Sequence, residues 1–242
     1  MKDIVNLSNI TKSFGDNSVL KGVSFDMTEG EIVGLIGPSG GGKSVLMKIM
    51  GQVLSADSGE INFHDLTTQE ISLMFQEGAL FDSLNVFDNV AFPLVDGNVP
   101  STSLPKARQE ELAEQVLGIL AKVGLAEAYR KYSAQLSGGM RRRVSLARSL
   151  VADPKLALLD DPTSGLDPVA SNVIMDLIQR VHRQEGTTML IASQDLRRLI
   201  PYVDRIIALF DGKVVYDGPS GSKDLLGNAE VSDFISCRYD LA

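Results

Sequence analysis

The chain has 242 residues, 44% of them hydrophobic, and carries a net charge of −8 at neutral pH. This apolar content is enough for a sizeable core and excludes an intrinsically disordered chain, while the acidic balance disfavours a nucleic-acid partner, which needs clustered Lys and Arg. The single cysteine, Cys237, allows no internal disulfide and is expected to be a buried or spectator thiol, and no apolar run approaches the ~18 residues of a membrane-spanning helix.

The first third of the chain is expected to be rich in β-strands. Short apolar runs are separated there by Gly, Asp and Asn residues, which are typical of turns. The expected strands are Ile4–Ile10, Leu20–Met27, Glu31–Ile36, Gly59–Phe63 and Ile71–Phe75.

The middle third is expected to be helical, and the last third alternates strands with helices. Apolar residues recur at helical spacing in Lys106–Val123 and Ser137–Ala152, and Gly97–Pro105 before them is expected to be a surface loop. Leu156–Leu159 is an all-apolar run of the kind buried on both faces of a parallel sheet. A helix, three strands and a short helix with a tail are expected to follow at Val169–Arg183, Thr187–Ala192, Arg205–Phe210, Lys213–Tyr216 and Asp224–Ala242.

This order of elements predicts an α/β fold in a single domain that covers residues 1–242. A strand-containing core, residues 1–76 and 151–242, is expected to be interrupted by a helical insertion at roughly residues 77–150.

Residues 37–44 form a complete G-x-x-x-x-G-K-[ST] phosphate-binding loop between an apolar strand and the start of a helix. Its glycines let backbone N–H groups turn towards phosphate oxygens, and the helix N-terminus adds partial positive charge. Lys43 can reach the outer phosphates and the Ser44 hydroxyl can bind Mg²⁺. The residues expected to hold the nucleotide here are Gly37, Pro38, Ser39, Gly40, Gly41, Gly42, Lys43 and Ser44.

Two carboxylates follow the apolar run Leu156–Leu159. Asp160 ends the run in the Walker B arrangement, in which the carboxylate holds Mg²⁺. Asp161 comes directly after it and is expected to orient and polarise the water that attacks the γ-phosphate.

Leu136–Met140, Leu-Ser-Gly-Gly-Met, opens the predicted helix Ser137–Ala152. Ser137, Gly138 and Gly139 offer a hydroxyl, free N–H groups and a favourable helix dipole, which together suit an anion.

These motifs resemble those of the ATP-binding cassette (ABC) ATPases, in the family's order and over nearly the whole chain. In that resemblance Gln76 is the Q-loop residue and a Mg²⁺ ligand, Ser164–Asp167 is the D-loop, and Phe14 stacks on adenine. The resemblance implies a P-loop NTPase with a RecA-like core, a β-rich N-terminal subdomain and an inserted α-helical subdomain. It also implies ATP and Mg²⁺ as ligands, and a homodimer in which Ser137, Gly138 and Gly139 of one subunit contact the γ-phosphate held by the other.

The segment after Gln76 resembles the Mla-type phospholipid transporter ATPases. The resemblance lies in Phe75–Phe81 and Asn85–Leu94, and in Met140, which replaces the usual final Gln of the family's signature motif, matched here by Leu136–Met140. It implies a polytopic permease as partner, a membrane-anchored MCE lipid-binding protein, and a position at the cytoplasmic face of the inner membrane. Amino-acid importers share part of this pattern, so an importer ATPase stays an alternative.

Two positions depart from the family pattern. Asp161 stands where the family usually has Glu, and Gln194 stands in the switch position, where it usually has His. Asp is shorter by a methylene, and Gln cannot become a cation, so Lys43, Asp161 and Gln194 together predict a slow ATPase with intact binding. A nucleotide-gated interaction subunit with little hydrolysis, and a soluble ABC ATPase of translation or DNA repair, are the other classes considered.

Other features are expected to be structural. Arg141, Arg142 and Arg143 fan around a helix, where we expect solvated surface with a few ion pairs. His64 and His182 lack neighbours with metal-ligand spacing.

Overall fold

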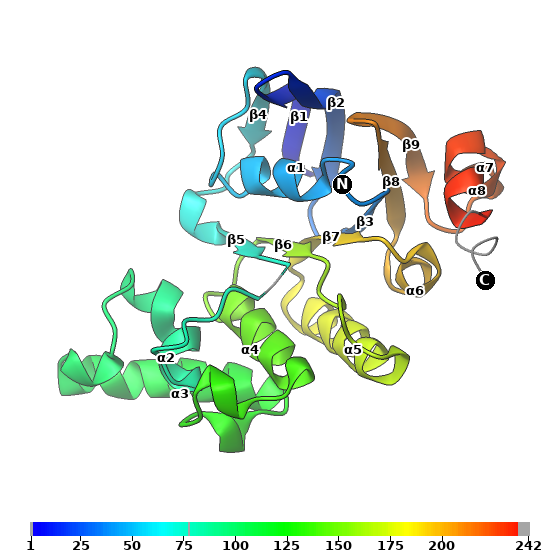
Figure 1. Ribbon diagram of the computed structural model, residues 1–242. Coiled ribbons are helices and arrows are strands. Elements are labelled where there is room, and N and C mark those ends of the chain that lie inside the picture. The colour runs from blue at the N-terminus through cyan, green and yellow to red at the C-terminus, as the bar shows by residue number, and fades with distance from the viewer. Residues whose placement is uncertain (1, 77, 237–242) are drawn as a thin grey trace.

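Three strands of the N-terminal part form a small antiparallel sheet (Figure 1). The computed structural model describes residues 2–76 and 78–236. The sheet contains β1 (Asp3–Phe14), β2 (Asn17–Thr28) and β4 (Ser58–Phe63), in the order β2-β1-β4. A hairpin joins β1 to β2, and Gly15 adopts a φ of 59° at its turn, a conformation that suits glycine.

Six strands form the second sheet, in the order β5-β6-β7-β3-β8-β9. The first five are parallel, and β9 pairs antiparallel to β8 at the edge. The strands β3, β6 and β7 are buried at every residue, because both faces of the sheet are covered. The strand bounds are β3 (Ile32–Ile36), β5 (Ile71–Met74), β6 (Leu156–Asp160), β7 (Thr188–Ser193), β8 (Arg205–Phe210) and β9 (Lys213–Pro219).

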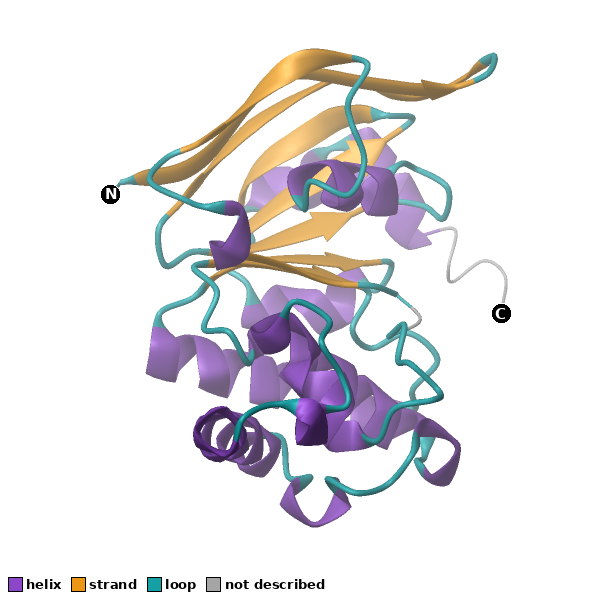
Figure 2. Ribbon diagram, turned by 90° about the vertical axis from the view of Figure 1, so that its left-hand side faces the viewer, coloured by secondary structure: helices purple, strands orange, loops and turns teal. Residues whose placement is uncertain are grey.

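Helix α1 (Lys43–Met50) lies between the two sheets (Figures 1 and 2). Its fully buried side chains Leu46 and Met47 belong to one apolar cluster with Leu7 of β1 and Leu35 of β3. Burying side chains of this size stabilises the fold by roughly 1.5–3 kcal/mol each. The N-terminal sheet therefore fixes the position of the helix that follows the phosphate-binding loop.

The other face of the large sheet is covered by helices (Figure 2). Helix α5 lies beneath it, and α2, α3 and α4 form a group that extends outward, at the lower left of Figure 1. Helices α7 and α8 pack beside β9 at the C-terminal end. The bounds are α2 (Val86–Ala91), α3 (Lys106–Lys122), α4 (Gly138–Leu150), α5 (Pro168–Glu185), α6 (Leu196–Leu199), α7 (Lys223–Gly227) and α8 (Ala229–Ser236).

The predicted α/β fold class is confirmed, with differences in detail. Strands β1 and β2 are each longer than expected, and α2 and α6 were not predicted, since helices of six and four residues carry too little periodicity. The expected surface loop Gly97–Pro105 contains a short helical turn in which Ser101 is buried, and the Ser101 N–H donates to Asp88 at 2.8 Å. The expected limits of the helical insertion, residues 77–150, stay a prediction.

The expectation of solvated arginines on α4 is confirmed for Arg141, which is exposed, whereas Arg142 and Arg143 are half-buried; the expected ion pairs stay a prediction. The side chains of Arg141, Arg142 and Arg143 donate to the backbone carbonyls of Leu136, Ser164 and Val123, at 2.8, 3.0 and 3.2 Å. These carbonyls sit in turns and loops, so the arginines satisfy acceptors that no regular ladder reaches.

The remaining structural expectations concern membranes, metals and the thiol. Within residues 2–76 and 78–236, no helix has the length and apolar character to cross a bilayer. Over the same residues no group of three or more His, Cys, Asp or Glu side chains is placed to hold a metal, and the His182 ring bonds to the Thr187 carbonyl at 2.9 Å. Cys237 lies outside the described residues.

Asn89 stabilises the loop that leads into α2. It is 1% exposed; its side-chain oxygen accepts from the Phe81 N–H at 2.8 Å, and its amide donates to the carbonyls of Phe81, Leu84 and Asn85. We expect Asn89→Ala to lower the free energy of unfolding by about 2–3 kcal/mol, because buried backbone groups lose their partners. Urea unfolding followed by circular dichroism measures this change.

The control is Asn98→Ala. Asn98 is exposed, and its amide donates one hydrogen bond, to the Val95 carbonyl at 2.9 Å. We expect a loss of at most about 1 kcal/mol for this variant. Equal losses of unfolding free energy in the two variants would show that the hydrogen bonds of Asn89 contribute no more to stability than the single bond of Asn98.

Candidate nucleotide-binding site

The phosphate-binding loop runs from the end of β3 to the start of α1, as the motif predicts. At Gly37, with a φ of 152°, an added Cβ would lie 2.0 Å from the Leu209 carbonyl oxygen of β8. At Gly42, with a φ of 96°, it would lie 2.8 Å from the Leu20 side chain of β2. The loop is thus pressed against both sheets at positions where only glycine fits.

Lys43 folds back over the loop that precedes it. Its side chain is buried, and its ammonium donates to the carbonyls of Gly37 and Pro38 at 2.7 and 2.8 Å. Burial of a lone ammonium group is unfavourable, so these charge-assisted bonds fix the cation in place. A positive charge is therefore positioned inside the ring of the loop, where phosphate oxygens would meet it.

Most of the predicted site residues line one cavity of about 260 Å³. Gly37 and Pro38 contribute through their carbonyls, which hold Lys43. The phosphate loop, the carboxyl ends of β6 and β7, and the tip of the β1–β2 hairpin meet at this cavity. The lining residues are Phe14, Val19, Ser39, Gly40, Gly41, Gly42, Lys43, Ser44, Val45, Gln76, Asp160, Asp161 and Gln194.

Ser44, Gln76 and Asp160 form a set of oxygen donors that fits Mg²⁺. All three line this cavity and also an adjoining one of about 560 Å³. Burial raises the pKa of Asp160, while a hydrogen bond from Ser44 and the charges of nearby lysines oppose that rise. A carboxylate that burial destabilises gains most from a nearby cation, and hydroxyl, amide and carboxylate oxygens are the hard ligands that Mg²⁺ prefers.

Asp161 and Gln194 both line this cavity and come directly after β6 and β7. Asp161 has a φ of 46°, and its N–H donates to the Ala192 carbonyl of β7 at 3.0 Å. Asp and Asn enter this left-handed region more readily than longer side chains do. The backbone therefore gives a local physical reason for Asp at a position where the resembling family usually has Glu.

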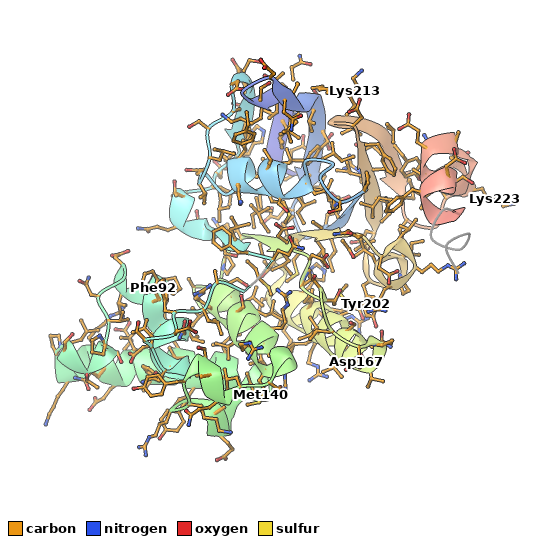
Figure 3. The ribbon with its side chains drawn as sticks, in the orientation of Figure 1. Phe92, Met140, Asp167, Tyr202, Lys213 and Lys223 are labelled. Carbon is orange, nitrogen blue, oxygen red and sulfur yellow. The ribbon has the colours of Figure 1, made fainter. Side chains whose placement is uncertain are left out.

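The signature residues Ser137, Gly138 and Gly139 lie away from the cavity that the phosphate loop lines. Ser137 caps α4 by accepting from the Met140 N–H at 3.2 Å, and Figure 3 labels Met140 in the helical part, below the large sheet. Ser137, Gly138 and Gly139 are not among the residues that line either cavity within the described part of the chain. The structure thus gathers the predicted phosphate-loop, Mg²⁺ and switch residues and leaves the signature residues apart.

Sequence reasoning missed several residues of the adjoining cavity. Lys48, Asp82, Ser133 and Arg141 line it, and the Ser133 hydroxyl bonds to the Asp82 carboxylate. Lys48 was within reach of a sequence argument, since it stands four residues after Ser44 on one helix face. The others come from loops and from α4, whose approach only tertiary structure reveals.

Arg148 was also missed. From α4 it donates to the carbonyls of Gly78 and Ala79 at 2.7 and 2.8 Å, and its guanidinium lies 5.7 Å from the centroid of the Phe81 ring. Burial lowers its pKa. These contacts tie the segment after Gln76 to the helix that begins at the signature.

Comparison with known proteins identifies the family. The sequence profile of the ABC transporter family matches residues 20–164. This chain belongs to the ABC transporter family. It is an ATP-hydrolysing P-loop cassette, the ATP-binding subunit of an ABC transporter.

The relatives of this cassette have names that refer to different substances. It is 36% identical to Protein TRIGALACTOSYLDIACYLGLYCEROL 3, chloroplastic, of Arabidopsis thaliana, over 98% of this chain and 74% of that protein. It is 35% identical to the Spermidine/putrescine import ATP-binding protein PotA of Mycoplasma capricolum, over 96% of this chain and 66% of that protein. The chain thus spans about two thirds to three quarters of these relatives.

Solved structures share the fold over nearly the full chain. A nucleotide-free ATP-binding cassette from an ABC transporter superimposes with a TM-score of 0.83 at 28% identity, covering 96% of this chain and 98% of that one. The dimeric cassette MJ0796 bound to ADP and Pi gives 0.75 at 29% identity, covering 90% and 99%. Clostridium perfringens cbiO1, part of the transporter complex cbiONQ, gives 0.79 at 27% identity, covering 98% and 96%.

Replacing Lys43 tests the role of its buried cation. We expect Lys43→Ala in this cassette to weaken ATP binding at least about tenfold, because the charge inside the loop is lost. Fluorescence titration with a labelled ATP analogue measures the affinity. Lys48→Ala, which removes a lysine of the same helix that lines only the adjoining cavity, is the control and should change affinity less than about twofold. Full affinity in Lys43→Ala would contradict the assignment of the phosphate site.

Proposed function

We propose that two copies of this ABC ATPase close head to tail over two ATP molecules, and that this closure drives lipid transport through a membrane permease.

The position of the signature residues is the observation that carries the shared ATP site. Ser137 and Gly138 are exposed, and an added Cβ on Gly138 or Gly139 would meet no atom within 4 Å. Sterics within this chain therefore give no reason for glycine at these positions. A helix N-terminus with free N–H groups and a hydroxyl suits the terminal phosphate of a nucleotide held by a second copy. The dimeric MJ0796 cassette bound to ADP and Pi supports this arrangement.

The residues around the cavity suit hydrolysis of the bound nucleotide. Lys43 and the loop N–H groups would hold the β- and γ-phosphates, and Phe14 would stack on the adenine. Ser44, Gln76 and Asp160 would hold Mg²⁺, which neutralises charge on the phosphates. Asp161 would orient the attacking water, and Gln194 would donate an amide hydrogen bond to the γ-phosphate.

A third cavity, of about 380 Å³, supports a permease contact. It lies between β5 and the helical part, and Phe81, Phe92 and Arg148 contribute to its wall. Phe81 is 40% exposed, and its ring lies 4.6 Å from that of Phe92, centroid to centroid. An apolar groove with a cation in its wall suits a short amphipathic helix of a membrane protein. The cbiO1 protein, part of a transporter complex, provides the analogy.

Lipid is the cargo that we favour. The name of the Arabidopsis relative contains that of a galactolipid, and the segment after Gln76 resembles the Mla-type ATPases. The partners would then be a polytopic permease and an MCE lipid-binding protein, with the ATPase at the cytoplasmic face of the inner membrane. The similarity to the spermidine/putrescine import protein keeps an importer ATPase as the second candidate.

Purification of the tagged chain from detergent-solubilised membranes of its source tests the partners and the cargo. We expect a polytopic membrane protein and an MCE-domain protein to co-purify, and extraction of the assembly to yield phospholipid in stoichiometric amount. Phe81→Asp, which puts a charge into the apolar groove, should release the membrane protein, whereas Leu117→Asp, on an exposed site of α3, should not. A permease accompanied by a periplasmic solute-binding protein, without lipid, would favour the importer.

Exchanging the two unusual residues tests the cause of slow turnover. We expect Asp161→Glu and Gln194→His each to raise steady-state phosphate release, by at least about tenfold in the double variant, since the longer carboxylate reaches the water and imidazole can carry charge. Asp161→Asn keeps a side chain that tolerates the left-handed backbone and should reduce release about 100-fold. No gain from either exchange would show that these residues do not limit the rate, and unchanged release in Asp161→Asn would remove Asp161 from the chemistry.

A further inference from the structure

The end of β1 that carries Phe14 loses its regular strand partner on one side. Pairing of β1 with β4 ends at Thr11 and Ser58, where the two hydroxyls lie 2.7 Å apart. On the other side, the register between β1 and β2 shifts between Lys12 and Ser13. The ladder alone therefore holds this end of β1 less firmly than the rest of the strand.

Asp57, the residue before β4, takes over the missing pairing. Its N–H donates to the Thr11 carbonyl at 2.9 Å, as a further strand residue would. Its carboxylate then accepts from the Ser13 N–H at 2.7 Å and from the Lys12 ammonium at 2.6 Å. The hydrogen bonds from Lys12 and Ser13 lower the pKa of Asp57, as expected for a carboxylate that receives two donors. The Asp57 side chain thus bonds to both residues that flank the register shift, Lys12 and Ser13.

Lys12 contacts both the Asp57 carboxylate and the ring of Phe14. The Lys12 side chain is only 14% exposed, and its ammonium lies 5.6 Å from the centroid of the Phe14 ring, within the range of a cation–π contact. Phe14 itself is half exposed at the hairpin turn and lines the nucleotide cavity. An exposed ring at a turn has freedom to rotate away, so a neighbouring cation held in place by a carboxylate restricts it.

We propose that Lys12 and Asp57 are positioning residues that hold Phe14 against the adenine, and so act on the base contact without acting on the triphosphate contact. The inference rests on the proposed stacking of Phe14. The phosphates are held by the loop between β3 and α1, a separate element, so the two contacts are separable. A cation beside the ring also draws electron density from it, which favours stacking on an electron-rich purine.

Two ligands distinguish the contacts, Mg²⁺-ATP and Mg²⁺ with inorganic tripolyphosphate. In the full chain, we expect Lys12→Met and Asp57→Asn to weaken ATP binding about three- to tenfold and to leave tripolyphosphate binding within about twofold. Competition against a fluorescent ATP analogue measures ATP, and calorimetric titration measures tripolyphosphate. Thermal unfolding of each variant checks that the fold is retained. If Asp57→Asn does not fold, Lys12→Met, which keeps the buried aliphatic stem, tests the proposal alone.

The matched controls come from the other end of the same two strands. Lys2 and Asp65 form an ion pair of the same 2.6 Å length, so Lys2→Met and Asp65→Asn should leave both affinities unchanged. Equal weakening of both ligands by Lys12→Met and Asp57→Asn, or no weakening of ATP, would overturn the inference. Phe14→Ala separates the two proposals. If it weakens ATP and the Lys12 and Asp57 variants do not, only the positioning role fails; if it leaves ATP unchanged, the proposed stacking fails with it.

Discussion

The parallel strands β3, β6 and β7 are the constraint on which the site depends. They are buried at every residue, so their register is set by packing on both faces and cannot slip without exposing apolar side chains. Parallel strands end at one edge of a sheet. That edge therefore receives the phosphate loop after β3, Asp160 and Asp161 at the end of β6, and Gln194 after β7.

The phosphate loop is stabilised by the same groups that would bind a ligand. The bonds from the Lys43 ammonium to the carbonyls of Gly37 and Pro38 keep the cation of the loop on its inner side. Asp160 lines the same cavity as a buried carboxylate, and burial raises its pKa while the Ser44 hydrogen bond and the Lys43 charge oppose the rise. A cavity lined by both an ammonium group and a carboxylate is preorganised for a ligand that carries both phosphate and a divalent cation.

The strand ends and the phosphate loop could be predicted from the sequence because their signals are local. In Leu156–Asp160, five adjacent residues show both the apolar character that predicts burial and the carboxylate that ends the strand. The contacts of Arg148 with Gly78 and Ala79, and of Asp57 with Ser13, span long stretches of chain and join backbone groups, which no residue pattern marks. The acceptors of the arginines on α4 were missed for the same reason, since they are backbone carbonyls.

Helix α4 connects the signature residues with the apolar groove at Phe81. At its start Ser137 caps the helix, and near its end Arg148 holds the segment that leads to Phe81 and the groove. Between them, Arg142 donates to the Ser164 carbonyl in the turn that precedes α5. A rigid helix that bonds to loops at both ends and in the middle moves those loops together. Closure at the signature would therefore displace the groove wall, and a partner seated in the groove would bias closure in return, because such coupling acts equally in both directions.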